Sequence, residues 1–212
     1  MTEHKPVHDM VHDETPIRLF KSDFLEFFSH IHPAVIFIIY LPVLAYFFWQ
    51  ASVEQLPLAS GLVTFLVGLI VWTLSEYILH RFVFHFPPHT PLLERITFLF
   101  HGVHHTQPQE PSRLVMPPVV SIPLGFLFYG LFSLVFGVLL KMPQVIGTAF
   151  SGFITGYLIY DLTHYATHHF PMHSGVLKYL KRYHMQHHYK TPEMRFGVSS
   201  PLWDIVFGTK PE

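Results

Sequence analysis

Four long apolar segments limit what this chain can fold into more than any other feature of its sequence. They run approximately over residues 34–50, 58–79, 118–140 and 145–166. Each approaches the roughly 20 residues that an α-helix needs to cross the hydrocarbon core of a membrane. Half of the 212 residues are hydrophobic and only 13% are charged, against about 25% in a typical soluble domain. The sequence therefore predicts an all-α integral membrane protein, multi-pass, with four transmembrane helices arranged as two hairpins.

The connection between the third and fourth segments leaves two arrangements open. Only the short run KMPQ, residues 141–144, joins them, and Pro123 interrupts the third segment. These two segments either cross the membrane fully or form a deep hairpin inside it. The first segment contains Pro42, which predicts a tilt or kink because proline removes a helical hydrogen bond.

The basic residues predict the orientation of the helices. All thirteen Lys and Arg residues except Lys141 lie before the first segment, between the second and third, or after the fourth. The positive-inside rule makes that side cytoplasmic, either of a bacterial inner membrane or of the endoplasmic reticulum. Polar residues 1–14 are expected to be a flexible tail, and residues 15–212 to be one membrane domain. Its His-rich cytoplasmic regions would cover residues 80–117 and 164–209.

A short surface helix is expected ahead of the first membrane segment. Thr15-Pro16 has the character of a helix start, and apolar residues then recur at helical spacing from Ile17 to Ile31. This pattern predicts an amphipathic helix that lies on the membrane surface.

The composition excludes several kinds of site. The chain has no Cys, so disulfides, thiolate metal sites and Cys nucleophiles are excluded. Its formal net charge of −1 gives no reason to expect a nucleic acid partner. The chain has 18 His residues, more than its Lys and Arg residues together, and a packed core has no need of so many.

Ten of these histidines fall into four clusters at the cytoplasmic ends of the membrane segments and in the regions that follow. The clusters contain His80 and His85, then His101, His104 and His105, then His164 and His168, and finally His184, His187 and His188. Residues three and four apart share one face of a helix. An H-x-x-H-H run therefore directs its first and third, or its first and second, imidazoles at a common point.

Ten imidazoles are too many ligands for one ion and suit two ions with about five each. Neutral imidazole binds iron, zinc and copper well. Ten histidines beside a membrane would also be costly unless something bound them. Two alternatives remain open. A metal transporter would place its ligands near the middle of the bilayer, and a structural zinc site would be closed and four-coordinate.

Five further residues are candidates for the surroundings of the metal site. Glu76 and Asp161 lie one turn before His residues, where each either orients a ligand imidazole or makes an ordinary helix-surface hydrogen bond. Tyr157 and Tyr160 either line the site on its substrate side or belong to an aromatic belt. His169 is either a group behind a ligand or a loop residue.

The residues around the histidines resemble those of the fatty acid hydroxylase superfamily, and within it those of the fatty acid 2-hydroxylases. The resemblance covers about residues 30–209, and it includes the residues between the histidines as well as the histidines themselves. Four motifs carry the resemblance. They are EYILHRF followed by His85, HGVHH followed by RLV and PP, YDLTHY followed by HH, and HMQHHY followed by FGVSS and WD.

This resemblance implies a di-metal centre that uses molecular oxygen to place a hydroxyl group next to the carbonyl of an acyl chain. The substrate would be a fatty acid or a sphingolipid acyl chain, the metal would be iron, and a purified sample could hold zinc. The metal centre itself would do the chemistry, with no separate nucleophile. Sister enzymes with similar metal chemistry are the alternatives: a desaturase, a sterol oxidase or a carotenoid hydroxylase.

The resemblance also predicts a separate electron donor. Fungal and animal members of the family carry an N-terminal cytochrome b5-like domain, and residues 1–30 are too few to hold one. Electrons are therefore expected from another protein, cytochrome b5-like or ferredoxin-like.

Overall fold

The computed structural model describes residues 15–211, and the expected flexible tail at residues 1–14 lies outside this part. The described residues form helices and connections without a strand, which confirms the all-α prediction. The long helices are α2 (Pro33–Val53), α3 (Leu58–Ile78), α6 (Pro118–Phe132), α7 (Ile146–His169) and α8 (Gly175–Tyr189). The short ones are α1 (Asp23–Phe27), α4 (Pro91–Thr97), α5 (Val103–Thr106) and α9 (Leu202–Val206).

Short segments of other helical types extend or join these helices. The π-helical segments are η2 (Leu79–Phe84), η3 (Phe98–Gly102) and η5 (Ser133–Leu139), and the 3₁₀ turns are η4 (Pro111–Arg113) and η6 (Pro143–Val145). Because η2 continues α3 and η5 continues α6, two of the apolar helices are longer than their α-helical parts.

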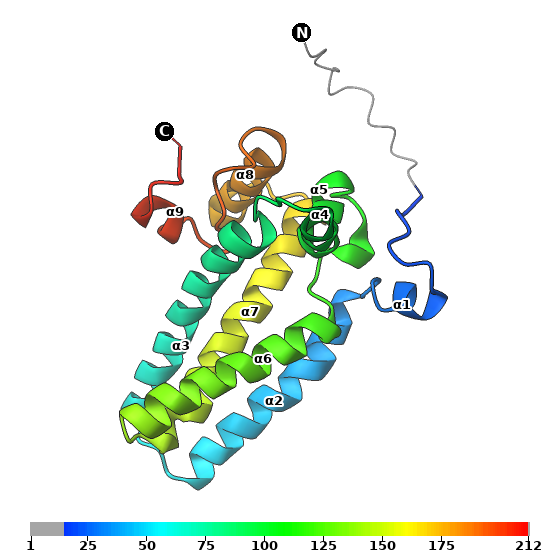
Figure 1. Ribbon diagram of the computed structural model, residues 1–212. Helices are drawn as coiled ribbons and strands as arrows, with labels where there is room; N and C mark the ends of the chain where they lie inside the picture. The colour runs from blue at the N-terminus through cyan, green and yellow to red at the C-terminus, as the bar shows by residue number, and fades with distance from the viewer. Residues whose placement is uncertain (1–14, 212) are drawn as a thin grey trace.

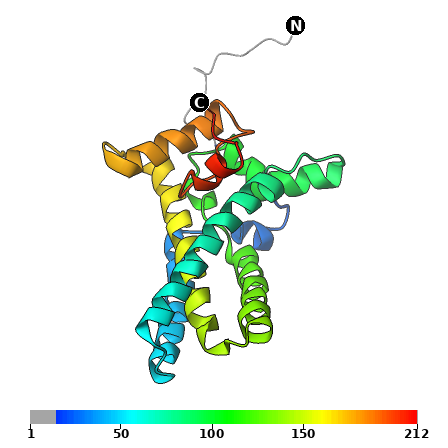
Figure 2. The same ribbon diagram turned by 90° about the vertical axis from the view of Figure 1, so that its left-hand side faces the viewer.

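Four helical stretches are long and apolar enough to cross a membrane, as predicted. They run over Pro33–Val53, Leu58–Phe84, Pro111–Leu139 and Pro143–His169. The third and fourth are 29 and 27 residues long, which is enough to span. The four helices lie side by side as an elongated bundle, and α4, α5, α8 and α9 gather at one end of it (Figures 1 and 2). The helix α2 continues through Pro42.

Helix α7 is the centre of this bundle. Its most apolar window is 72% buried inside the protein, against 22% or less for the other three spans. It meets α3 at close range because Gly152 faces the Phe65 carbonyl and Gly68 faces the Ala149 carbonyl. Small residues permit this approach in membranes, where helices associate through packing and hydrogen bonds.

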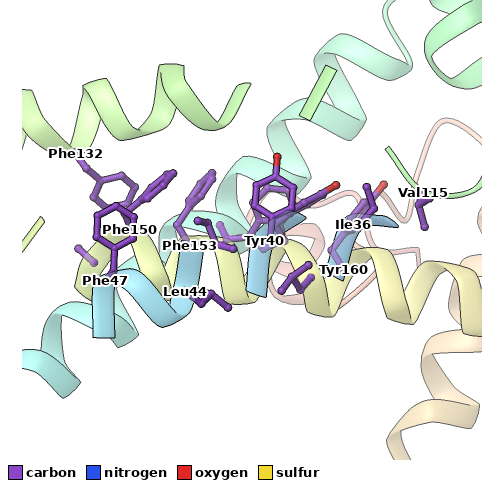
Figure 3. Packing of buried hydrophobic residues seen from close by; sticks show 14 of the residues in the cluster. Ile36, Tyr40, Leu44, Phe47, Val115, Phe132, Phe150, Phe153 and Tyr160 are labelled. Carbon is purple, nitrogen blue, oxygen red and sulfur yellow. The ribbon is translucent and has the colours of Figure 1, made fainter. Parts of the chain in front are cut away.

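Aromatic rings fill the space between the spans. Figure 3 shows Phe47 of α2 beside Phe150 of α7, whose rings meet edge to face at a centroid distance of 5.8 Å. Nearer the end that carries the short helices, Tyr157 packs against Tyr40 and Trp72, both at 5.2 Å. The core therefore continues along the bundle up to the histidine-bearing end of α7.

The segment ahead of α2 differs from the predicted amphipathic helix. Only Asp23–Phe27 is helical, because tertiary contacts take up the backbone groups of the residues before it. The Ile17 N–H donates to Gln107 at 2.8 Å, and the Ile17 carbonyl accepts a hydrogen bond from Arg113. The prediction of one helix over residues 17–31 was wrong, since periodicity does not report such contacts.

Candidate metal centre

The ten clustered histidines come together as two groups of five at one end of the bundle. In each group the five ring nitrogens lie within 4.8 Å of one another. Group one is His80, His85, His101, His105 and His187. Group two is His104, His164, His168, His184 and His188. The two groups are therefore each able to hold one metal ion.

Both H-x-x-H-H runs divide their histidines between the groups. In the first run His101 and His105, four residues apart, join group one, and His104 joins group two. In the second run the outer pair joins group two, and His187 joins group one. Of the two geometries that the spacing allowed, the structure therefore uses the pair four residues apart.

A π-helical turn explains how His80 and His85 reach the same group. A spacing of five does not place two residues on one face of an α-helix. Here η2 replaces the α-helix, and the His85 N–H bonds to the His80 carbonyl at 3.0 Å. This five-residue hydrogen bond closes a wider turn, so both rings point into group one. Such π-turns occur frequently at functional sites.

The Nε2 atoms of group two form a continuous series of short contacts. The distances are 3.0 Å from His164 to His104, 3.0 Å from His104 to His188, 3.0 Å from His188 to His184 and 2.9 Å from His184 to His168. A ring nitrogen carries either one proton or one lone pair. The three inner nitrogens each have two neighbours, so hydrogen bonds cannot account for the whole series.

A shared cation does account for these distances. Imidazole nitrogens bind zinc at about 2.0–2.1 Å, so two ligands at a right angle lie about 3.0 Å apart. Group one repeats the spacing, with 3.0 Å from His80 to His101, 3.1 Å from His101 to His105 and 3.1 Å from His85 to His187. The donor sets therefore fit two ions of the kind that imidazole prefers.

Burial keeps the imidazoles neutral and their lone pairs free. Removal from water lowers the pKa of His187 to about 4 and that of His85 to about 3. The pKa values of His101, His104 and His184 are also well below the ordinary value, first from burial and then from neighbouring histidines. At neutral pH these side chains are therefore neutral and able to bind a metal ion, rather than cationic.

Backbone carbonyls orient two ligands of group one. The His80 Nδ1–H donates to the Phe196 carbonyl at 2.5 Å, and the His187 Nδ1–H donates to the Met194 carbonyl at 2.7 Å. Each bond fixes the proton on Nδ1 and leaves the Nε2 lone pair for a metal.

Glu76 holds the loop that supplies these carbonyls, instead of contacting a ligand imidazole. Its carboxylate is 3% exposed and accepts the N–H groups of Val198 at 2.6 Å and Ser199 at 2.8 Å. It also accepts the Ser199 hydroxyl. The helix-surface alternative for Glu76 is therefore excluded, because its partners lie more than 120 residues away along the chain.

Asp204 also holds this loop in place through hydrogen bonds. It was not among the site residues predicted from the sequence. Its buried carboxylate accepts the N–H groups of Phe196 at 2.9 Å and Gly197 at 2.8 Å, and the Thr209 hydroxyl at 2.7 Å. The only sequence signal was the WD pair within the fourth motif.

The remaining four candidates all belong to α7, the helix that carries His164 and His168 of group two. The Tyr160 ring is buried 5.7 Å from the His164 ring, measured between centroids. Asp161 is buried with the Tyr157 hydroxyl beside its carboxylate. His169 belongs to neither group, and its ring lies against Tyr165 at 4.6 Å.

A small cavity of about 20 Å³ lies between the spans, beside Tyr157. Tyr40, Trp72, Ser121, Phe153 and Tyr157 contribute to its walls. A volume of this size holds about one water molecule. This cavity is therefore too small to hold a molecule much larger than water.

Comparisons with known proteins agree on one family. The sequence profile of the Fatty acid hydroxylase family matches residues 65–209. A dihydroceramide fatty acyl 2-hydroxylase of Arabidopsis thaliana is 35% identical over 205 residues, which cover 97% of this chain and 84% of that protein. A ceramide very long chain fatty acid hydroxylase of Schizosaccharomyces pombe is 39% identical over 98% of this chain and 58% of its own length.

A solved structure has the same fold. It is full-length scs7p, in which only the hydroxylase domain is visible. The match has a TM-score of 0.80 and 37% sequence identity, and covers 90% of this chain and 70% of that one.

Proposed function

The chain belongs to the fatty acid hydroxylase family, and from this premise we propose that it is a membrane monooxygenase that hydroxylates carbon 2 of an acyl chain. The acyl chain would be that of a sphingolipid or of a free fatty acid. The relatives are named for 2-hydroxylation of dihydroceramide and for hydroxylation of ceramide fatty acids, and these names support the proposed substrate class.

The observation that carries the proposal is the pair of five-nitrogen groups at one end of an apolar bundle. Five ligands per ion exceed the four of a structural zinc site. The groups also lie toward one end of the spans. A transporter would instead place its site near their middle. A metal-activated oxidation next to the membrane surface fits this placement better than either alternative.

The metals would supply the oxidation, and the protein would supply the ligands and orientation. When bound, a pair of redox-active ions such as iron would supply the activation of molecular oxygen, with two electrons from the external donor. In the overall reaction, molecular oxygen, two electrons, two protons and one C–H bond give one C–OH group and one molecule of water. The ten neutral histidines hold the ions, and the protein contributes no nucleophile. Zinc would occupy the same ligands without redox activity.

The ten ligands come from segments between η2 and α8, so we treat residues 15–212 as one membrane domain. We assign Tyr157, Tyr160 and Asp161 to the substrate side, because they precede the group-two histidines His164 and His168 on α7. His169, outside both groups, is assigned only a place near the site.

We place the metal centre on the cytoplasmic side, of a bacterial inner membrane or of the endoplasmic reticulum. Among the residues that the structure describes, the basic side chains gather at the end of the bundle that holds the histidines, and only Lys141 lies at the other end. Lys178 and Arg182 are exposed on α8, which carries three ligands. Their charge favours docking of an acidic electron donor, cytochrome b5-like or ferredoxin-like.

Expression in a host that lacks 2-hydroxylated lipids tests this function. The chain and a His104→Ala variant are produced side by side with a compatible electron donor, and total acyl chains are analysed by mass spectrometry. We expect new 2-hydroxy acyl chains with the parent and none with the variant, because the variant loses one of the five nitrogens of group two.

Other products would redirect the assignment. A new double bond, an oxidised sterol or a hydroxylated carotenoid would keep the metal centre but contradict the substrate and position proposed. No new lipid from a parent shown to contain metal and supplied with electrons would favour a metal-binding protein without enzymatic activity.

A further inference from the structure

We infer that the two metal sites hold their ions unequally, and that the loop Met194–Ser199 is the device that strengthens group one. This inference deepens the proposed function and rests on it, because it requires a metal ion in each group. The loop lies outside the ten ligands, and its positioning residues are Glu76 and Asp204.

Group one is tied to the loop through two of its five ligands. His80 comes from η2 and His187 from α8, and both donate their Nδ1–H groups to carbonyls of the loop. Both side chains are almost completely buried, at 1% and 0% exposed. The loop thus fixes two rings that come from different helical segments.

The loop is itself held in place by two buried carboxylates. Asp204 accepts the N–H groups of Phe196 and Gly197, and Glu76 accepts the next two N–H groups along the chain. Four consecutive backbone N–H groups, from Phe196 to Ser199, therefore point at carboxylate oxygens. Such charge-assisted bonds are stronger than bonds between neutral groups, so the carbonyls that face the ligands are held rigidly.

Glycine is required at position 197 for this arrangement. A Cβ atom there would lie 2.0 Å from the Ser200 carbonyl oxygen and 2.9 Å from Asp204 Oδ2. The first contact is with backbone and cannot be relieved by rotating a side chain. The tight turn that brings both carboxylates to the loop thus excludes any larger residue.

Group two has no equivalent support. The Nδ1 atoms of all five ligands are buried, and none makes a hydrogen bond to a protein group within the part of the chain that the structure describes. The Leu114 carbonyl lies near the His164 ring, but without hydrogen-bond geometry. The two groups therefore have the same number of ligands and different surroundings.

This difference predicts different metal affinities. A protein acceptor on Nδ1 fixes the tautomer and raises the basicity of the ligand, and its loss typically costs about 10–100-fold in metal affinity. The ion in group two should consequently leave before the ion in group one.

Metal release from purified protein tests the inference without an activity measurement. The parent in detergent is loaded with zinc, excess chelator is added, and zinc bound per chain is followed over time. We expect two phases of one equivalent each. His168→Ala, which removes a group-two ligand, should abolish the fast phase. Asp204→Asn should accelerate the slow phase by about 10–100-fold and leave the fast phase unchanged.

A matched control separates the loop from a general loss of stability. The Glu26 carboxylate also accepts two backbone N–H groups, those of Leu19 at 2.9 Å and Phe20 at 2.8 Å. Glu26→Gln should leave both phases unchanged. If Asp204→Asn does not yield folded protein, the milder Ser199→Ala, which removes only the hydroxyl bond to Glu76, should still accelerate the slow phase.

Two results would overturn the inference while leaving the proposed function intact. They are the release of two equivalents in a single phase, and an equal acceleration of both phases by the loop variants. A parent that binds no zinc would instead contradict the metal centre itself, and the inference with it.

Discussion

The contact between α3 and α7 at Gly152 should control metal binding, although it lies among the membrane spans. In Gly152→Ala, the new Cβ would stand 1.9 Å from the Phe65 carbonyl oxygen and 2.7 Å from its carbon. Both are backbone atoms, so no rotamer change relieves the clash. Ordinary carbon–oxygen contacts are about 3.3–3.6 Å, and the two helices would therefore have to separate by more than about 1 Å.

This separation would reach both metal groups. Helix α3 leads directly into His80 of group one, and α7 carries His164 and His168 of group two. Metal–ligand distances tolerate changes of only about 0.2 Å, so a shift of about 1 Å removes ligands from the metal ions. Overpacking typically costs about 1–3 kcal/mol. For a chain of this length, that lowers the unfolding temperature by roughly 2–12 °C.

The assay is metal content per chain after dialysis, together with thermal unfolding in detergent. Gly130→Ala is a matched control because no atom lies within 4 Å of its added Cβ. We expect the control to retain metal and stability and Gly152→Ala to lose both. If Gly152→Ala binds metal as the parent does, then the close helix contact does not position the ligands and the reasoning fails.

Two further predictions concern protonation and electron supply. Since the folded-state pKa values of His187 and His85 are about 4 and about 3, below the ordinary histidine value of about 6.5, their contribution to stability is complete above pH 6.5. This contribution should be lost as pH falls through 4 and 3. Thermal unfolding of metal-free protein measures the loss, and a gain in stability over this pH range would contradict the prediction. Lys178→Glu should raise the KM for an acidic electron donor several-fold without changing metal content, whereas Lys141→Glu, at the other end of the bundle, should change neither.

The helices and the ten clustered histidines were predictable because each has a local signal. Apolar runs of sufficient length mark the spans, and H-x-x-H-H runs mark faces of helices. The division of these histidines between two groups was not predictable in this way. It depends on how α5 and α8 cross in space, and on the π-turn that brings His85 under His80. A spacing of five identifies a cluster but not a shared group.

The contacts of Glu76 show a second limit of local signals. Its position one turn before His80 left two possibilities open, orientation of that imidazole or a hydrogen bond on the helix surface, whereas its hydrogen bonds go to Val198 and Ser199. Both residues stand in the FGVSS motif, but the sequence does not state that this motif folds back onto α3. A carboxylate in an apolar helix predicts that a partner exists, and only the tertiary fold identifies it.

The divided H-x-x-H-H runs make the two metal groups parts of one structure. Helix α8 gives two ligands to group two and one, His187, to group one, while the first run divides in the opposite sense with His104 in group two. A rotation of either helix would therefore move ligands of both groups at once. Neither group can be completed while one of these helices is displaced, so the two proposed metal sites should assemble together. Their unequal strength must consequently come from groups outside the runs, and the loop Met194–Ser199 is the feature that contacts ligands of group one alone.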